Sequence, residues 1–197
     1  MHDIDHRTIN PKCRMCGETD ETVEHLVSAC PKQGQTEYKA RNDKVASIVH
    51  WHLCKKYGIS VEKEWYKHQP DSVCENDRTK ILWDFSIQTD KDIQARRPDL
   101  VVVDKAQNAV TIIDIAIPAD INIVGKEEEK IMKYQDLKME IRRLWKKKGR
   151  VVPIVVGALG SVPKNPQDLD LSGCECRTLQ KASLLGMARI LRRVMAL

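Results

Sequence analysis

The chain has 197 residues, of which 42% are hydrophobic and 31% are charged, and this composition is typical of a folded globular protein. Its length suits one ordinary domain with a small appendage, and its formal net charge of +5 permits but does not require contact with nucleic acid. No apolar run is as long as a membrane span, and the first residues, MHDID, do not resemble a signal peptide. We therefore expect an intracellular protein that makes no membrane contact.

Four potential metal ligands lie near the start of the chain. Cys13, Cys16, His25 and Cys30 follow the spacing Cys-x2-Cys-x8-His-x4-Cys. Zinc in structural sites takes four such ligands in a tetrahedron, and a Cys-x2-Cys turn supplies two thiolates from one tight loop. The chain has 7 cysteines, an odd number, and no secretory signal, which favours metal binding over disulfides. The spacing predicts a zinc knuckle over residues 1–35, with Zn²⁺ in a structural role.

Residues 36–76 are predicted to form a helical linker region. Apolar residues at helical spacing run from Glu37 to about Tyr57 and stop before Gly58, while residues 61–76 fit either a helix or a loop. His50, His52 and Cys54 lie on this helix and make a second group of possible ligands. We interpret them as an ordinary helix surface, and Cys74 receives no role from the sequence.

Residues 77–197 show the pattern of a mixed sheet flanked by helices, which is an α/β fold. Alternating apolar residues from Ile81 to Ile87 predict a first strand. The next two strands are expected to pair as an antiparallel hairpin. A long helix, a third apolar strand and a terminal helix from about Arg177 complete the domain, with a turn at Cys174–Cys176 and a loop-like stretch from Gly160 to Gly173. The predicted hairpin strands, long helix and later strand are Pro98–Asp104, Ala109–Ile117, Lys126–Lys148 and Val151–Val156.

Two carboxylates interrupt the apolar strands of the predicted hairpin. Asp99 precedes the run Leu-Val-Val-Val, and Asp114 lies inside the run Thr-Ile-Ile-Asp-Ile-Ala-Ile. An unpaired charge in such a setting costs several kcal/mol, on the order of the penalty for a buried ion, so each acid needs a cationic partner. A shared divalent metal, Mg²⁺, would supply it. The alternative is that the two acids cap turns at the strand ends.

A lysine is needed to complete a nuclease site of the restriction-enzyme type. Such nucleases carry Pro-Asp, a second acid and a lysine two residues after that acid, where strand geometry keeps the acid and the lysine on one face. Here that position is Ala116. On the following helix, Lys130 falls in the middle of the apolar stripe and Lys133 at its edge. Lys130 is therefore predicted to meet the two acids, unless its ammonium extends past the core to solvent.

These motifs together resemble the C-terminal part of the polyprotein of site-specific non-LTR retrotransposons. The resemblance rests on the four Cys and His residues, on Arg97-Pro98-Asp99 with Asp114, and on Lys130-x2-Lys133-Tyr134. It covers nearly the whole chain, and the displaced lysine is a feature of that endonuclease group. The family's reverse transcriptase, which precedes the knuckle, has no counterpart here, so we expect a fragment or remnant of such an element.

The resemblance implies a restriction-endonuclease-like domain of the PD-(D/E)xK type that nicks target DNA and leaves a 3′-hydroxyl. The implied catalytic residues are Asp99, Asp114, Lys130, Lys133 and Tyr134, with Mg²⁺ bound by Asp99 and Asp114. The implied partner is DNA, with RNA as a second possibility, and the implied compartment is the nucleus. A catalytically inactive remnant that only binds nucleic acid is the main alternative. A third possibility is a helper that binds a protein partner. Nicking of DNA in Mg²⁺ would distinguish the nuclease from these two alternatives.

Basic residues are expected to contact phosphates at three places. Lys12 and Arg14 lie in the predicted knuckle, and Arg96 and Arg97 precede the first acid. A third basic group is the run Lys-Lys-Lys-Gly-Arg at 146–150, for which a solvated surface is an equally good interpretation. Phosphate contacts at these residues would make the affinity for DNA fall with rising salt.

Overall fold

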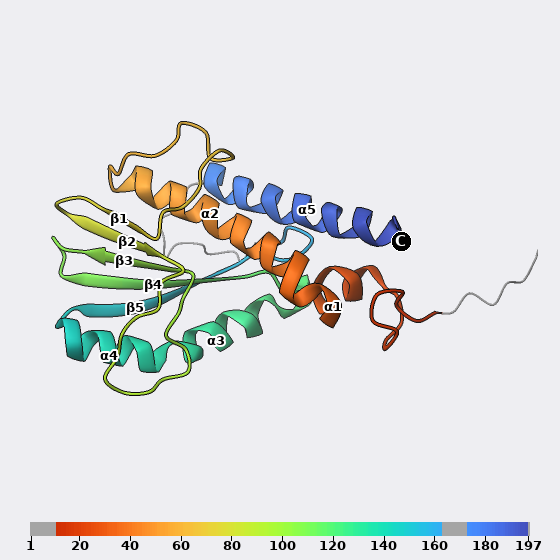
Figure 1. The fold of residues 1–197 in the computed structure, drawn as a ribbon, viewed down its shortest axis with the longest axis horizontal. Coiled ribbons are helices and arrows are strands. Elements are labelled where there is room, and N and C mark those ends of the chain that lie inside the picture. Colours follow the sequence, from red (N-terminus) through yellow and green to blue (C-terminus); the bar gives the residue numbers. More distant parts are fainter. Residues whose placement is uncertain (1–10, 163–172, 197) are drawn as a thin grey trace, which may run out of the picture.

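A computed structural model describes residues 11–162 and 173–196 (Figure 1). The first ten residues lie outside the described part, as do 163–172, which include most of the predicted loop-like stretch between Gly160 and Gly173. The described chain forms one five-stranded sheet with helices on both faces (Figure 1). The predicted mixed α/β fold is confirmed at this level. Among the described residues no helix is long and apolar enough to cross a membrane.

The sheet has the strand order β1-β2-β3-β4-β5. Its strands are Val73–Glu75 (β1), Thr79–Trp83 (β2), Leu100–Asp104 (β3), Ala109–Ala116 (β4) and Lys148–Val155 (β5). Neighbours from β1 to β4 are antiparallel, and β5 joins β4 in parallel. The predicted hairpin of β3 and β4 is confirmed. Both strands are almost continuously apolar because helices cover the sheet on both sides.

Two sequence predictions at the β1 edge of the sheet are wrong. The strand expected to reach Ile87 ends at Trp83, because Asp84 has a positive φ of 44° that turns the chain out of the sheet. Residues 73–75, expected in a helix or loop, form β1. A strand of three residues is too short to show a periodic pattern, and its pairing with β2 is what defines it.

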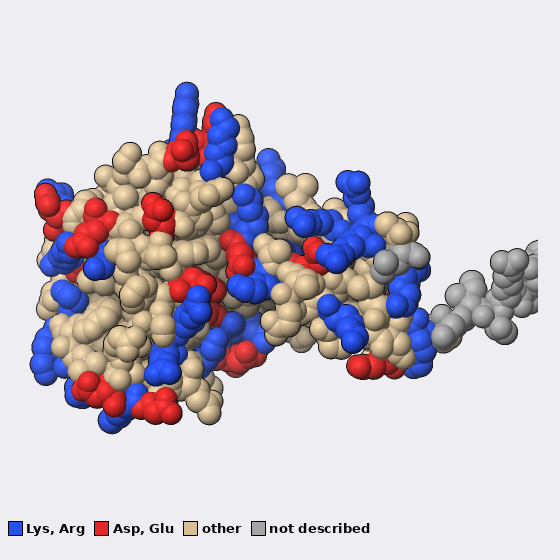
Figure 2. All heavy atoms as spheres, viewed as in Figure 1, with Lys and Arg blue, Asp and Glu red and all other residues tan. Residues whose placement is uncertain are grey.

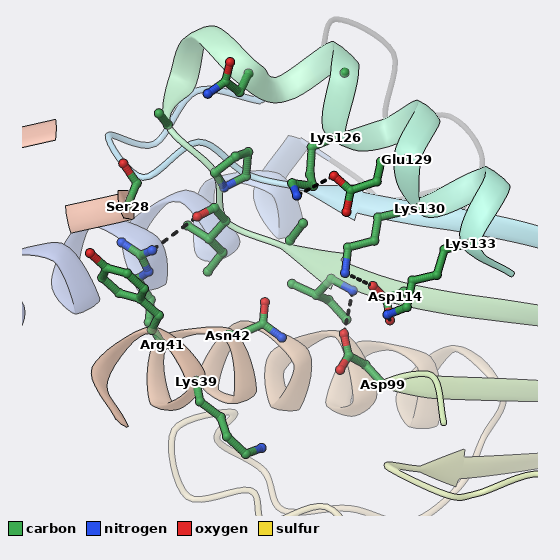
Figure 3. A pocket seen from close by; sticks show the side chains of 18 of the residues that line it. Ser28, Lys39, Arg41, Asn42, Asp99, Asp114, Lys126, Glu129, Lys130 and Lys133 are labelled. Carbon is green, nitrogen blue, oxygen red and sulfur yellow. Dashed lines mark hydrogen bonds and ion pairs between the residues drawn. The ribbon is translucent and has the colours of Figure 1, made fainter. Parts of the chain in front are cut away.

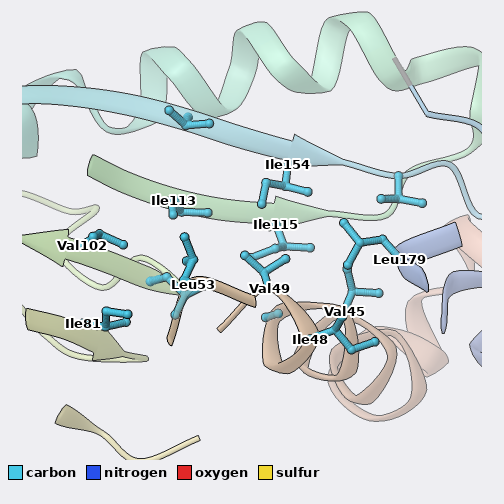
Figure 4. Packing of buried hydrophobic residues seen from close by; sticks show 14 of the residues in the cluster. Val45, Ile48, Val49, Leu53, Ile81, Val102, Ile113, Ile115, Ile154 and Leu179 are labelled. Carbon is cyan, nitrogen blue, oxygen red and sulfur yellow. The ribbon is translucent and has the colours of Figure 1, made fainter. Parts of the chain in front are cut away.

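One face of the sheet is covered by α2 (Lys39–Lys56) and α5 (Gly173–Met195) (Figure 1). The apolar stripe of α2 packs on alternate residues of the strands (Figure 4). The labelled members of this core are Val45, Ile48, Val49, Leu53, Ile81, Val102, Ile113, Ile115, Ile154 and Leu179. The helix within the predicted linker therefore belongs to the main core of the molecule.

Two details of these helices differ from the sequence predictions. The interpretation of His50 and Cys54 as helix surface is wrong, because both are 0% exposed. His52 is partly exposed and lies 3.0 Å from a carboxylate oxygen of Glu175. The turn expected at Cys174–Cys176 is also wrong, because these residues lie in the first turn of α5.

The opposite face is covered by α3 (Ile123–Lys133) and α4 (Gln135–Trp145) (Figure 1). The sequence predicted one helix over 126–148, but Tyr134 leaves helical geometry, with φ −104° and ψ 12°, and divides it in two. Tyr134 is fully buried and packs with Leu137 and Ile141 against the strands. Lys146 ends α4 in the left-handed conformation, and β5 begins two residues later.

The N-terminal part folds beside one end of the sheet and contacts α5. It contains the short helices η1 (His25–Ala29), α1 (Pro31–Gln33) and η2 (Gly34–Tyr38). A small cluster of Cys13, Leu26, Cys30 and Val194 joins it to the end of α5. Arg41 on α2 is 4% exposed and donates hydrogen bonds to the carbonyls of Val27 and Ile117, so it ties this part to the exit of β4. The predicted domain boundaries stay predictions.

Candidate active site

The two acids lie opposite each other at one end of the β3–β4 hairpin. Leu100 pairs with Ile113, so the next pair outward in the antiparallel register is Asp99 with Asp114. Opposite residues of an antiparallel pair project from the same face. Asp114 is 3% exposed and Asp99 is partly buried, so the hairpin brings two carboxylates together in a poorly solvated place. We call Asp99 and Asp114 the acid pair.

Burial, the charge of Asp114 and two hydrogen bonds act on the pKa of Asp99. Its Oδ2 accepts a hydrogen bond of 2.6 Å from the backbone N–H of Ile115, and Asn42 on α2 provides a side-chain hydrogen bond. Burial and the nearby charge of Asp114 outweigh these bonds and raise the pKa of Asp99 to about 6. The acid pair is thus close enough for one carboxylate to disfavour ionisation of the other.

Lys130 meets Asp114 directly. Its ammonium forms an ion pair with Oδ2 of Asp114, and its side chain is only 16% exposed (Figure 3). Lys133 lies one turn further along α3, with its ammonium 3.9 Å from Oδ1 of Asp114 and its side chain 42% exposed. Among these two lysines, Lys130 is the one buried against the acid, and the alternative that it extends past the core to solvent is wrong.

Tyr134 holds the other oxygen of Asp114. Its hydroxyl donates a hydrogen bond of 2.5 Å to Oδ1 of Asp114. Burial and the charge of Asp114 raise the pKa of Tyr134 above its usual range, so this hydroxyl stays protonated as a donor. Tyr134 lies at the break between α3 and α4, where a single uninterrupted helix was the wrong expectation.

Ala116 is buried at the strand position where the nuclease motif would place a lysine. Ala116 lies two residues after Asp114 on the same face of β4, and it packs with Ile123 of α3 and Val155 of β5. A small residue here lets the start of α3 approach the sheet. The lysine therefore comes to Asp114 from the helix, because the strand position already contacts that helix.

A cleft of about 880 Å³ opens over the acid pair. Its walls come from α2, α3, the end of β4 and the short helix η1 (Figure 3). Positive side chains on these walls are Lys39, Arg41, Arg97, Lys126, Lys130 and Lys133. Asn42 and Glu129 also line the cleft, and sequence reasoning missed both. Asn42 carries no local signal, since α2 meets the acid pair only through the fold, whereas Glu129 directly precedes Lys130 on α3.

The acid pair presents a donor set that fits a hard divalent cation. Carboxylate oxygens are what Mg²⁺ and similar ions prefer. Oδ2 of Asp114 is buried and accepts no hydrogen bond of regular geometry, and Lys130 faces it as an ion-pair partner. In the described part of the chain no third His, Cys, Asp or Glu comes close enough to form a three-ligand group with the pair. Two protein carboxylates would bind such an ion, and its other coordination positions would be left for water or substrate.

Cys13, Cys16, His25 and Cys30, which we call the N-terminal Cys/His cluster, are brought together as their spacing predicted. Their potential ligand atoms all lie within 4.8 Å of one another. The Sγ atoms of Cys13 and Cys30 are 4.0 Å apart, and Sγ of Cys16 is 3.4 Å from Nε2 of His25. A tetrahedral zinc with ordinary bond lengths sets these edges at about 3.8 and 3.6 Å. The geometry fits a four-coordinate structural ion.

The thiols of this cluster differ in their surroundings. Backbone N–H groups of Glu18 and Thr19 lower the pKa of Cys16 to about 6. Burial raises the pKa of Cys30 to about 11. A turn whose amides point at sulfur is a known way to favour the thiolate, which is the form that binds metal.

The four basic residues predicted to bind nucleic acid all have a carboxylate partner. Lys12 lies 3.3 Å from Asp20 and Arg14 lies 2.7 Å from Glu21. Arg97 pairs with Asp84 at 2.7 Å, and Arg96 lies 4.0 Å from Asp92. Of these four, only Arg97 lines the cleft. Contacts of these residues with phosphate stay a prediction, and they would have to compete with these pairs.

The basic run at 146–150 lies at the other end of the sheet. Lys148 pairs in register with Ala109, five residues before Asp114 on β4, which is about 16 Å along a strand. In the view of Figure 2, many Lys and Arg side chains gather instead over the N-terminal part and the end of α5. The run therefore does not belong to the cleft.

Comparisons with known proteins give little further information. No protein-family model matches the sequence. No curated protein matches it either. Among solved structures the chain is similar to an N-terminal domain of a reptarenavirus L protein, at 13% identity and a TM-score of 0.36, over 80% of this chain and 68% of that one. A likeness at this TM-score indicates neither a shared function nor shared site residues.

Proposed function

We propose that this protein is a metal-dependent endonuclease that hydrolyses a phosphodiester of DNA and leaves a 3′-hydroxyl, in the manner of the restriction-endonuclease-like region of non-LTR retrotransposon polyproteins. One observation carries the proposal: Asp99 just before β3, Asp114 on β4, Lys130 on α3 and Tyr134 at the α3–α4 junction converge in one cleft. A purely structural sheet would not need two adjacent carboxylates at this place.

Each residue of the site has a distinct part in this proposal. The acid pair binds Mg²⁺, which when bound acts as a Lewis acid at the phosphate and lowers the pKa of water. Tyr134 fixes the orientation of the Asp114 carboxylate through its hydrogen bond. Lys130 is already at the carboxylate edge, where its ammonium can donate to the attacking water and offset charge on the phosphate. Lys133 is farther from Asp114 and more exposed, which suits contact with a flanking phosphate.

The cleft is suited to a polyanion. Lys39 on α2 and Lys126 on α3 line the cleft from different walls, so a DNA strand that crosses the acid pair would have positive side chains on two sides. Lys39 pairs with Asp43, and Lys126 pairs with Glu129. Exposed pairs of this kind contribute about 0–1 kcal/mol, so phosphates can compete for these lysines. The N-terminal Cys/His cluster would bind Zn²⁺ in a structural role, and a DNA substrate would be met in the nucleus.

The decisive experiment is nicking of supercoiled plasmid by the full chain in Mg²⁺. The parent should convert supercoiled into open-circular DNA, and Asp114→Asn should abolish this conversion. Asp92→Asn is the matched control, since it removes the charge of an aspartate whose side chain is 99% exposed and that lies outside the cleft. A parent that binds DNA but never cuts in Mg²⁺ or Mn²⁺ would contradict the proposal and favour an inactive nucleic-acid-binding remnant.

Lys130 and Lys133 form an internal comparison on one helix. Lys130→Ala should slow nicking by roughly 10²–10³-fold, because it removes a preorganised charge at the reacting phosphate. Lys133→Ala should slow it by no more than about tenfold, since its ammonium lies 3.9 Å from Asp114 in a more exposed position. Equal losses in both variants would overturn the assignment of Lys130 to the reacting group.

A further inference from the structure

Three potential metal ligands meet inside the main core, far from the acid pair in sequence and on the other side of the sheet. His50 and Cys54 lie one turn apart on α2, and Cys74 lies on β1. Their ligand atoms are all within 4.8 Å of one another. We call these three residues the core Cys/His cluster. His50 and Cys54 are fully buried, and Cys74 is partly buried.

The distance between Cys54 and His50 fits two neighbouring ligands of a tetrahedral ion. Sγ of Cys54 lies 3.6 Å from Nδ1 and 3.8 Å from Nε2 of His50. Zinc bond lengths of about 2.3 Å to sulfur and 2.0–2.1 Å to nitrogen set the edge between the two atoms at about 3.6 Å. Cys54 and Cys74 also interact directly through their side chains. A small shift of these side chains would let an ion enter between them.

His68 orients the imidazole of His50. Nε2 of His68 lies 2.7 Å from Nδ1 of His50, and the two rings stack with centroids 4.9 Å apart. Because Nδ1 of His50 is engaged in this hydrogen bond, Nε2 is its free nitrogen. Metal-binding histidines commonly have their second nitrogen held in this way, which fixes the ring and its tautomer. His68 is itself 7% exposed, so the hydrogen bond joins two buried imidazoles.

We infer that His50, Cys54 and Cys74 bind a structural Zn²⁺, with His68 as the hydrogen-bond partner of His50. Binding replaces the two thiol protons, which are released to solvent, and the two thiolates balance the charge of the ion. A neutral cluster of this kind suits an apolar core. Zinc is favoured over magnesium because sulfur and imidazole are softer ligands than carboxylate.

The site would link the short edge strand β1 to α2. β1 has three residues and pairs only with β2, so few backbone hydrogen bonds hold it in place. A bond from Cys74 through zinc to α2 would fix β1 to the helix that packs on the sheet. The ring of Trp83 at the end of β2 contacts His50 in a T-shaped arrangement, with the ring centroids 5.8 Å apart. This role does not depend on the proposed nuclease activity.

The test is the zinc content of the purified full chain, measured by elemental analysis. If both clusters bind zinc, the parent contains about two zinc ions per chain, and Cys74→Ser and Cys16→Ser each lose about one. Cys176→Ser is the matched control, because it removes a thiol that belongs to neither cluster, and it should keep both ions. His68→Ala should keep the ligands but weaken zinc binding by about 10–100-fold.

Cobalt substitution makes the test independent of total zinc. In a Cys16→Ser background, Co²⁺ should give the strong visible bands of a tetrahedral site and thiolate charge-transfer bands, and Cys74→Ser should remove them. Circular dichroism checks that each variant is folded, and an unfolded Cys74→Ser is replaced by Cys74→Ala. Zinc content unchanged by either Cys74 variant would overturn the inference. So would a Cys54–Cys74 disulfide found by mass spectrometry of the parent under non-reducing conditions.

Discussion

The two Cys/His clusters contain the same types of ligand, but different parts of the structure hold those ligands in position. The N-terminal cluster draws four ligands from one short stretch of chain, and only a small group of apolar residues surrounds it. The core cluster draws ligands from a helix and from a strand about 20 residues later, inside the largest hydrophobic core. In the first case a bound ion would largely create the local structure. In the second, the packed core already positions His50 and Cys54, and a bound ion would add the link to Cys74 on β1.

Exchange of metal should separate the two clusters most strongly. A chelator should remove zinc from the N-terminal cluster at least roughly 100-fold faster than from the core cluster, because the first needs local opening and the second needs opening of the core. The measurement is the time course of zinc release into a colorimetric chelator, with Cys74→Ser used to assign the slow phase. A single phase that accounts for both ions would break the comparison.

Removal of apolar side chains should affect the two surroundings unequally. Ile48→Ala in the main core should lower the free energy of unfolding of the whole chain by about 2–5 kcal/mol. Leu26→Ala, next to the N-terminal cluster, should cost less globally and should mainly increase local proteolysis of the N-terminal part. Denaturant unfolding gives the first value and limited proteolysis gives the second. Equal global losses would show that the N-terminal part folds as one unit with the sheet.

Gly157 tests how closely the end of β5 is packed. A Cβ atom added there would lie 2.3 Å from Oδ1 of Asp120, whose carboxylate accepts hydrogen bonds from the backbone N–H groups of Leu159 and Ser161. Gly157→Ala should therefore destabilise the chain by about 1–3 kcal/mol, as overpacking does. Gly34→Ala is the control in the N-terminal part, where nothing lies within 4 Å of the added atom. Thermal unfolding of both variants measures the difference.

The smallest expected effect concerns the ion pair in the N-terminal part. Arg14 donates hydrogen bonds to Glu21 and holds the pKa of that carboxyl below its usual value. The pair therefore contributes stability above the ordinary pKa of a glutamate, about 4.3, and this contribution is lost as the pH falls through the lowered value. An NMR titration should show the pKa of Glu21 returning toward its usual value in Arg14→Gln. No change in that titration would show that the pair does not persist in solution.

Patterns confined to a short stretch of sequence were the ones that predicted structure well. The spacing of the N-terminal cluster and the apolar runs of β3, β4 and β5 identified real features, and the position of Lys130 in the helical stripe pointed toward Asp114. Periodicity failed where a residue left its regular conformation, at Asp84 and at Tyr134. It also failed for β1, because a short edge strand is defined by its neighbour.

The sequence by itself determined the apolar runs of β3, β4 and β5, the amphipathic helices and the ligand spacing near the N-terminus, since each depends on residues close together in the chain. Only the tertiary structure decided which distant groups meet. It brought Asn42 of α2 to the acid pair, and it placed Cys74 beside His50 and Cys54. These meetings depend on strand order and on which helix covers which face. Such choices are made by burial of the whole apolar surface at once, and no local pattern records them.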